Sequence, residues 1–215
     1  MPRRLRPALV LATIPLLTAC AADRPGPRAS IEAYRVAGTA NPADALNPPI
    51  VPATHTKGMF LAYRPGATAV TYNPKLVPPG ATAEVSLVLT VQGTTVRLTV
   101  TGLLPHRAYG AHLHADPCGA RPAMAGPHVQ HQPDPHANPS APSVDPGYAN
   151  PHNEVWLDFT ADRHGSADVT VAQPWAFDDR HPPRSLVLHA GLTRTAAGVA
   201  GTAGPRLACL SLPAE

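Results

Sequence analysis

Apolar and polar residues alternate most regularly between residues 84 and 101. Residues 84–91 place apolar side chains at 85, 87, 89 and 91 and polar ones at 84, 86 and 90, and residues 95–101 alternate in the same way after Gln92-Gly93. A period of two places all the apolar side chains on one face of an extended strand. The pattern therefore predicts an antiparallel hairpin with one buried face.

Shorter stretches of the same kind follow along the chain, and no stretch has the pattern of a long helix. We expect six further strands, at residues 68–72, 109–114, 155–160, 167–171, 185–189 and 206–212. Eight short strands separated by turn residues are typical of an all-β barrel or sandwich. Between two of them, residues 115–153 form a long loop rich in proline and histidine. A loop this long is usually functional or disordered, and its histidines favour a functional one.

The N-terminus has the pattern of an export signal. Three arginines precede the apolar run 8–17, which is too short for a permanent membrane helix of about 20 residues. The run ends in Leu17-Thr18-Ala19-Cys20, which resembles a bacterial lipobox, where cleavage precedes a lipidated cysteine. We expect residues 1–19 to be a lipoprotein signal peptide and Cys20 to anchor the mature chain on the extracytoplasmic side of the membrane. The alternative is an ordinary secretory signal in which Cys20 is incidental.

Removal of this signal changes the charge of the protein. The formal net charge of +3 falls to 0, because residues 1–19 contain three arginines and no acid. No cluster of Lys and Arg remains, so the composition gives no support for nucleic-acid binding. Residues 20–55 are rich in Pro and Ala and predict a disordered tether, which leaves 56–215 as one folded domain.

Three cysteines are an unusual number for an exported protein, because a free thiol is a liability in an oxidising compartment. Lipidation of Cys20 leaves an even pair, Cys118 and Cys209, which can form a disulfide. Closing a loop of about 90 residues would stabilise the fold by about 4 to 5 kcal/mol in the chain-entropy model.

Four histidines are candidates for metal ligands. His112 and His114 are two residues apart on a predicted strand, so their side chains project from the same face with Cα atoms about 6.5 Å apart. Two imidazoles placed in this way can bind one ion. His128 in the long loop and His189 at the end of another apolar strand add two further candidates.

Five sequence blocks surround these residues in a fixed order: Gly110-Ala-His-Leu-His114, Cys118, Gly126-Pro-His128, Arg184-Ser-Leu-Val-Leu-His189 and Gly201-Thr-Ala-Gly-Pro-Arg-Leu-Ala-Cys209. Together they resemble the copper/zinc superoxide dismutase family over about residues 66–214. The resemblance implies an eight-stranded Greek-key β-barrel or sandwich with a long metal-binding loop.

The resemblance also implies a role for each matched residue. His112, His114, His128 and His189 match the copper ligands, and four nitrogen ligands suit copper in both redox states. His128 matches the histidine that bridges copper to zinc, and we expect it to carry protons. Arg206 matches the arginine that receives the superoxide anion, and Cys118 and Cys209 match the family disulfide.

Zinc is the point at which this chain departs from the family. His136 and His152 are the candidates for zinc histidines, but Val155 stands where an aspartate is expected. Glu154, Asp145 or Asp134 would have to replace that aspartate, so we expect little or no zinc. His131 has no counterpart in the family. We interpret it as a solvated loop histidine, and the alternative is a replacement ligand three residues after His128.

Loop 190–205 has Arg194 as its only charged residue. It therefore lacks both the charges that steer superoxide and the aspartate that links the two metal sites in the family. The leading hypothesis is copper-dependent dismutation of superoxide at the cell surface. The alternatives are a copper-binding or copper-buffering lipoprotein with little or no dismutase activity, and a barrel with only a structural role. The sequence predicts no oligomeric state.

Overall fold

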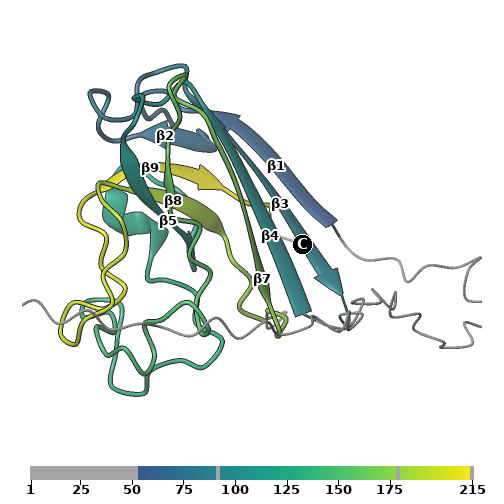
Figure 1. The fold of residues 1–215 in the computed structure, drawn as a ribbon, viewed down its shortest axis with the longest axis vertical. Helices are drawn as coiled ribbons and strands as arrows, with labels where there is room; N and C mark the ends of the chain where they lie inside the picture. The colour runs from purple at the N-terminus through teal and green to yellow at the C-terminus, as the bar shows by residue number, and fades with distance from the viewer. Residues whose placement is uncertain (1–52, 91–92, 178–179, 214–215) are drawn as a thin grey trace, which may run out of the picture. The chain divides into compact units, whose positions relative to one another are not determined.

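The computed structural model describes residues 53–90, 93–177 and 180–213, which contain nine strands and one short 3-10 helix (Figure 1). These residues all belong to one compact unit, Asn47–Glu215. The predicted signal peptide 1–19, Cys20 and most of the predicted tether 20–55 lie outside the described residues. The described part of the chain contains no helix that is long and apolar enough to cross a membrane.

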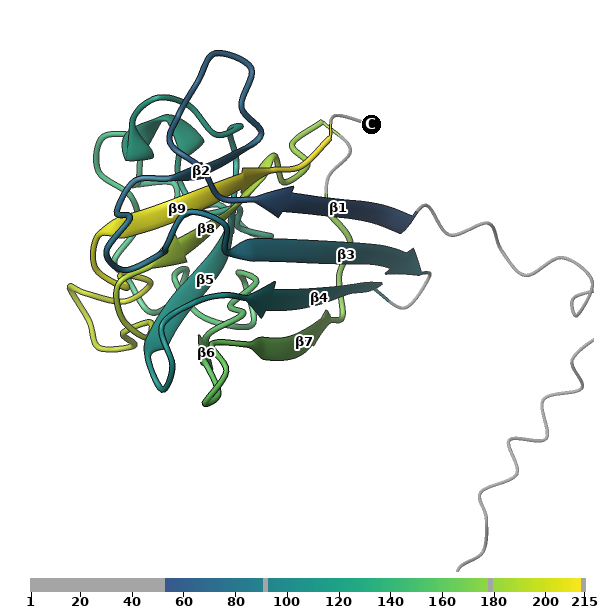
Figure 2. The ribbon, with the colours of Figure 1, turned by 90° about the horizontal axis from the view of Figure 1, so that it is seen from above.

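The first sheet is antiparallel and has the strand order β1-β3-β4-β7 (Figure 2). Its strands are β1 (Ala53–Met59), β3 (Thr82–Thr90), β4 (Gly93–Thr101) and β7 (Ala167–Gln173). Strands β3 and β4 are the predicted hairpin, and the alternating burial along β4 confirms its one buried face.

The second sheet has the order β2-β9-β8-β5-β6 and is also antiparallel. Its strands are β2 (Ala69–Thr71), β5 (Ala108–His114), β6 (Phe159–Thr160), β8 (Ser185–His189) and β9 (Arg206–Ser211). Every residue of β8 is buried, and so are all but the first of β5. These two neighbouring strands carry His112, His114 and His189, so three of the four predicted metal ligands lie on buried and paired strands.

The hydrophobic core takes side chains from both sheets. Val85 and Leu98 of the first sheet belong to the same buried cluster as Leu113, Leu188 and Leu210 of the second. The all-β prediction is therefore confirmed, as a sandwich of two antiparallel sheets whose apolar faces share one core.

Strand β1 was not among the eight strands that the sequence predicts, and the predicted start of the domain at residue 56 falls inside it. Its side chains alternate only between half-buried and exposed, and the half-buried ones belong to Thr54, Thr56 and Gly58. No apolar alternation marks such a strand in the sequence. Gly58 is needed there, because a Cβ atom at this position would lie 2.5 Å from Leu210 Cδ1 and 2.7 Å from Ala69 Cβ.

The predicted strand 155–160 is a two-residue strand, β6, preceded by an extended segment that makes only isolated bridges. Val155 and Leu157 of this segment are buried in the core. Because successive side chains of an extended chain point in opposite directions, Glu154, Trp156 and Asp158 turn away from the core. Glu154 is hydrogen-bonded to His128, Trp156 donates to Glu154, and Asp158 accepts from Thr193.

The long loop 115–153 contains no strand, as predicted, and its one helical turn is a 3-10 helix, η1 (Pro122–Ala125). A disulfide joins Cys118 of this loop to Cys209 of β9, with Cα atoms 5.7 Å apart. This confirms the expected cysteine pairing. It ties the first part of the loop to the second sheet.

Candidate metal centre

Strands β5 and β8 hold three of the four predicted metal ligands. His112 and His114 lie two residues apart on β5, and both are completely buried. Their ring centroids are 6.4 Å apart. His189 ends β8, at a point where the pairing with β9 shifts register, and its ring centroid lies 4.8 Å from that of His112.

His128 reaches the same place because the long loop folds back on β5. The backbone N–H of Val129 donates to Leu113 O, and that of Ala115 donates to Pro127 O. These bonds hold the segment on both sides of His128 against the strand. The His128 ring centroid consequently lies 4.1 Å from that of His112 and 4.6 Å from that of His114.

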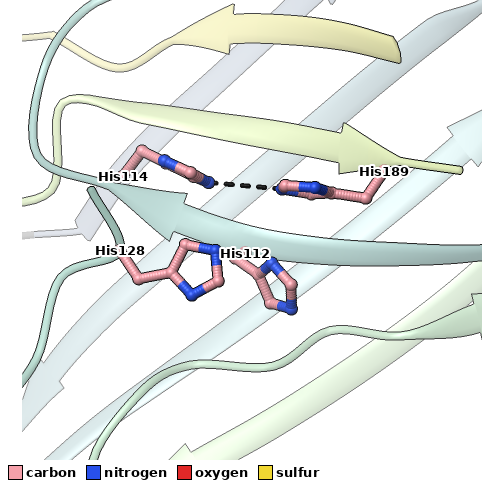
Figure 3. A group of neighbouring side chains, drawn as sticks. All are labelled: His112, His114, His128 and His189. Atoms are coloured by element: carbon pink, nitrogen blue, oxygen red, sulfur yellow. Dashed lines mark hydrogen bonds between the residues drawn. The ribbon is translucent and has the colours of Figure 1, made fainter. Parts of the chain in front are cut away.

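The four imidazoles can each offer one nitrogen to a single ion. One nitrogen from each of His112, His114, His128 and His189 can be chosen so that all four lie within 4.8 Å of one another (Figure 3). The Nε2 atoms of His114 and His189 are 3.4 Å apart. In the described ranges, no other group of three or more His, Cys, Asp or Glu side chains meets this spacing.

The second nitrogen of each ring makes a hydrogen bond outside the group. His114 Nδ1 lies 2.9 Å from Gly126 O, His189 Nδ1 lies 3.2 Å from Gly204 O, and His128 Nδ1 lies 2.7 Å from Glu154 Oε2. Carbonyl and carboxylate oxygens only accept, so these Nδ1 atoms carry the hydrogen and leave Nε2 for a metal. His112 is reversed, because its Nε2 makes the outside contact, 2.6 Å from Thr193 Oγ1.

Burial keeps three of these imidazoles neutral. Loss of solvent lowers the pKa of His112 and of His114 well below the ordinary histidine value, and the charge that His128 can carry lowers both further. Burial lowers the pKa of His189 to about 3. Metal ligation needs the neutral form of imidazole, so these histidines are ready to bind at neutral pH without first losing a proton.

Glu154 is the acidic residue that the structure places beside His128. It is 2 % exposed, and its carboxylate accepts further hydrogen bonds from Gln130 Nε2 at 2.8 Å and Trp156 Nε1 at 2.7 Å. Val155, at the position expected for aspartate, faces the core instead. Among the three acids that could replace the expected aspartate, Glu154, one residue before Val155, is the one that contacts His128.

The other zinc candidates do not join this carboxylate. His136, Asp145 and His152 are exposed. Asp134 accepts hydrogen bonds from Ser143 Oγ and the backbone of His136. His131 is exposed and its ring stacks on Trp175 with centroids 4.8 Å apart.

Arg206 begins β9 and is half-buried beside the histidines. Its guanidinium donates to Pro122 O at 3.0 Å and to Gly126 O at 2.6 Å. Gly126 O is also the acceptor for His114 Nδ1. Arg206, His128 and His189 together line a cavity of about 730 Å³.

Sequence reasoning missed two residues at the site, Thr193 and Asp158. Asp158 lies within the predicted strand 155–160, and Thr193 lies in loop 190–205, which contains no acid. Neither belongs to a ligand motif. The only available signal was the alternation of residues 154–158, which places Asp158 on the same side as Glu154.

Comparison with known proteins gives matches among solved structures only. No family model and no curated protein matches this chain. Copper/zinc superoxide dismutase from Brucella abortus is 17 % identical, covers 74 % of this chain and 99 % of its own length, and has a TM-score of 0.47. A superoxide dismutase-like protein from Bacillus subtilis is 15 % identical, with coverages of 61 % and 89 % and a TM-score of 0.41. This chain is thus similar to a copper/zinc superoxide dismutase and to a superoxide dismutase-like protein.

Proposed function

We propose that this protein is an exported, copper-dependent superoxide dismutase of the copper/zinc superoxide dismutase family. In the overall reaction, two superoxide anions and two protons give one dioxygen and one hydrogen peroxide. The observation that carries the proposal is the convergence of His112, His114, His128 and His189, each with its second nitrogen held by a fixed partner.

The donor set fits copper. Four imidazole nitrogens without thiolate suit copper in both of its redox states, whereas a structural zinc site more often includes cysteine. His112 Nδ1 is buried and makes no hydrogen bond, which is costly for a polar atom unless a ligand completes it. Bound copper would supply the one-electron chemistry that oxidises one superoxide and reduces the next.

Arg206 receives the anion. Two backbone carbonyls fix its guanidinium, and a guanidinium has further N–H groups that would donate to a small oxyanion. Burial lowers the pKa of Arg206, but a guanidinium stays charged at neutral pH. A fixed positive charge beside the metal would attract superoxide and stabilise the peroxide that leaves.

His128 carries the proton. Its Nδ1–H remains hydrogen-bonded to Glu154, so Nε2 is the only ring nitrogen with a lone pair. Nε2 would take up a proton when it is released from reduced copper, and would return to copper when it gives the proton up. The Glu154 carboxylate, 2.7 Å away, offsets the positive charge that the ring gains when Nε2 is protonated. This makes His128 a general acid for the departing peroxide.

The proposed location is the extracytoplasmic face of the cell membrane, with a lipid on Cys20 as the anchor. The lipobox-like sequence Leu17-Thr18-Ala19-Cys20 supports the anchor. The Cys118–Cys209 disulfide supports an oxidising compartment.

A copper-binding or copper-buffering lipoprotein is the second candidate function. It is favoured by loop 190–205, in which Arg194 is the single charged residue. Arg194 Nε donates a hydrogen bond to Thr202 Oγ1 at 3.0 Å. Such a loop supplies little field to draw superoxide into the site.

A superoxide assay on the copper-loaded mature protein, together with metal analysis, separates these functions. Dismutation at one copper per chain supports the enzyme. Full copper loading without dismutation supports the copper-binding protein instead. Failure of the chain to bind copper rejects both and favours a purely structural barrel.

A further inference from the structure

A threonine and an aspartate form a chain of hydrogen bonds behind His112. His112 Nε2 lies 2.6 Å from Thr193 Oγ1, and Thr193 Oγ1 donates to Asp158 Oδ1 at 2.8 Å. The backbone N–H of Thr193 donates to the other carboxylate oxygen at 2.6 Å. The backbone N–H of Ala111 donates to Asp158 Oδ1 at 3.2 Å. The aspartate therefore joins strand β5 to loop 190–205.

The chemistry of these groups fixes the direction of the chain. A carboxylate only accepts hydrogen bonds, and a hydroxyl has one hydrogen to donate. Since the Thr193 hydroxyl gives its hydrogen to Asp158, only its lone pairs can face His112. The hydrogen between His112 and Thr193 must then belong to His112 Nε2. In a neutral imidazole this leaves the lone pair on Nδ1.

His112 Nδ1, the nitrogen that keeps the lone pair, is also the one without a hydrogen-bond partner among the described residues. His112 Nδ1 is the buried ring atom of the four histidines that makes no hydrogen bond in the described structure. His114, His128 and His189 hydrogen-bond through Nδ1 to oxygens outside the group, which leaves Nε2 for the metal. His112 hydrogen-bonds through Nε2 instead, so a separate partner must hold its ring with Nδ1 toward the metal.

We propose that Thr193 and Asp158 are positioning residues that fix the tautomer and orientation of His112, so that its Nδ1 faces the metal. The inference rests on the proposed copper site but not on dismutase activity. Loop 190–205 contains no acid of its own. It supplies the Thr193 hydroxyl, and the carboxylate comes from Asp158 in the extended segment before β6.

Asp158→Asn is the sharpest variant, because it preserves size and reverses the hydrogen-bond direction. The Asn amide can keep an oxygen toward the Thr193 N–H and turn its NH₂ toward Thr193 Oγ1. The Thr193 hydroxyl is then free to donate to His112 Nε2, which places the ring hydrogen on Nδ1. Thr193→Val removes the hydroxyl at nearly constant volume, and Thr193→Ser retains it.

Two measurements test the proposal. The first is the ¹⁵N chemical shift of the His112 ring in the metal-free mature protein, which reports the tautomer. We expect Nε2–H in the wild type and in Thr193→Ser, and Nδ1–H in Asp158→Asn. The second is copper affinity by chelator competition. We expect Asp158→Asn and Thr193→Val to weaken it about tenfold to a hundredfold, as is usual for a group that orients a ligand, and Thr193→Ser to restore it.

Thr195→Val is the matched control, because Thr195 is an exposed threonine of the same loop. It should bind copper like the wild type. The proposal is overturned by a wild-type His112 with its hydrogen on Nδ1, or by wild-type copper affinity in both Asp158→Asn and Thr193→Val. A wild-type protein that binds no copper would reject the proposed function. The tautomer measurement would then still decide whether the ring hydrogen of His112 lies on Nε2, since it needs neither copper nor a variant that folds.

Discussion

Glu154 Oε2 lies 2.7 Å from His128 Nδ1, so a buried carboxylate holds the ring nitrogen of His128 that the proposed copper does not use. The carboxylate is itself fixed by Gln130 and Trp156. With its hydrogen pointing at Glu154, Nδ1 has no lone pair to give to a second metal. His128 can therefore be oriented toward copper without zinc.

Removing this carboxylate should weaken copper binding. We expect Glu154→Ala to reduce copper affinity about tenfold to a hundredfold, because His128 loses the partner that orients it. Glu154→Gln should cost less, since an amide oxygen can still accept from Nδ1–H. Chelator competition measures both. Glu84→Ala, which removes a half-exposed acid of the first sheet, is the control and should have no effect.

The same geometry predicts the metal content of the mature protein. Loaded with copper and zinc together, it should hold one copper per chain and little or no zinc, as elemental analysis would show. One zinc per chain in the wild type would contradict this prediction and would mean that zinc displaces Glu154 from His128.

Arg206 and His189 should separate binding from turnover. His189→Ala removes a ligand, so copper binding and dismutation should both be lost. Arg206→Ala should retain copper, because Gly126 O still accepts from His114. Its rate should fall about a hundredfold, near the lower end of the loss expected when one fixed group that stabilises an anion is removed. Arg206→Lys keeps the charge and should recover part of the rate. If Arg206→Ala lowered copper occupancy as much as His189→Ala, Arg206 would be a structural part of the copper site.

Sequence reasoning reached the strands whose burial is strongly patterned. Strand β8 was predicted to the residue, and the hairpin β3–β4 was recognised because half of its side chains enter the core. Strand β1 was missed because its inner face consists of Thr54, Thr56 and Gly58, which carry no apolar signal.

The site was predictable where the ligands lie in ordered motifs, and unpredictable where it depends on tertiary contacts. His112, His114, His128 and His189 stand in recognisable blocks. The family spacing places the aspartate at position 155, where this chain has valine. Alternation of side chains turns Val155 into the core and turns Glu154 toward His128. Thr193 and Asp158 are 35 residues apart and meet only after β5 and the loop before β9 are in place.

The oxidised mature protein should contain no free thiol in its folded domain, because Cys118 and Cys209 are paired. Titration of the denatured, unreduced protein should detect none, and two reactive thiols per chain would reject the pairing. The double variant Cys118→Ser/Cys209→Ser should lose about 4 kcal/mol of unfolding free energy, which a denaturant titration of the metal-free protein can measure.

Cys20 should decide the location of the protein. We expect the wild type to fractionate with membranes and Cys20→Ser to be released as an exported soluble protein, because a serine cannot accept the diacylglycerol. Labelling with a radioactive fatty acid should mark only the wild type. A wild type that is already soluble would contradict the lipid anchor but not the export of the chain.

The rate of the enzyme should depend only weakly on ionic strength. A steered enzyme collects superoxide through charges spread around its channel, and salt screens those charges over a Debye length of about 10 Å at 0.1 M. Here loop 190–205 contributes only Arg194, so the attraction comes mainly from Arg206 and the metal at the end of the path. At that short range screening removes little of the interaction. Stopped-flow or pulse-radiolysis rates should therefore change less than about threefold between 0.01 and 0.2 M salt.

Ala197→Lys, at an exposed position of this loop, should raise the rate at low salt and make its salt dependence steeper. A wild-type rate that falls tenfold or more over this range would show that charges outside the loop steer superoxide.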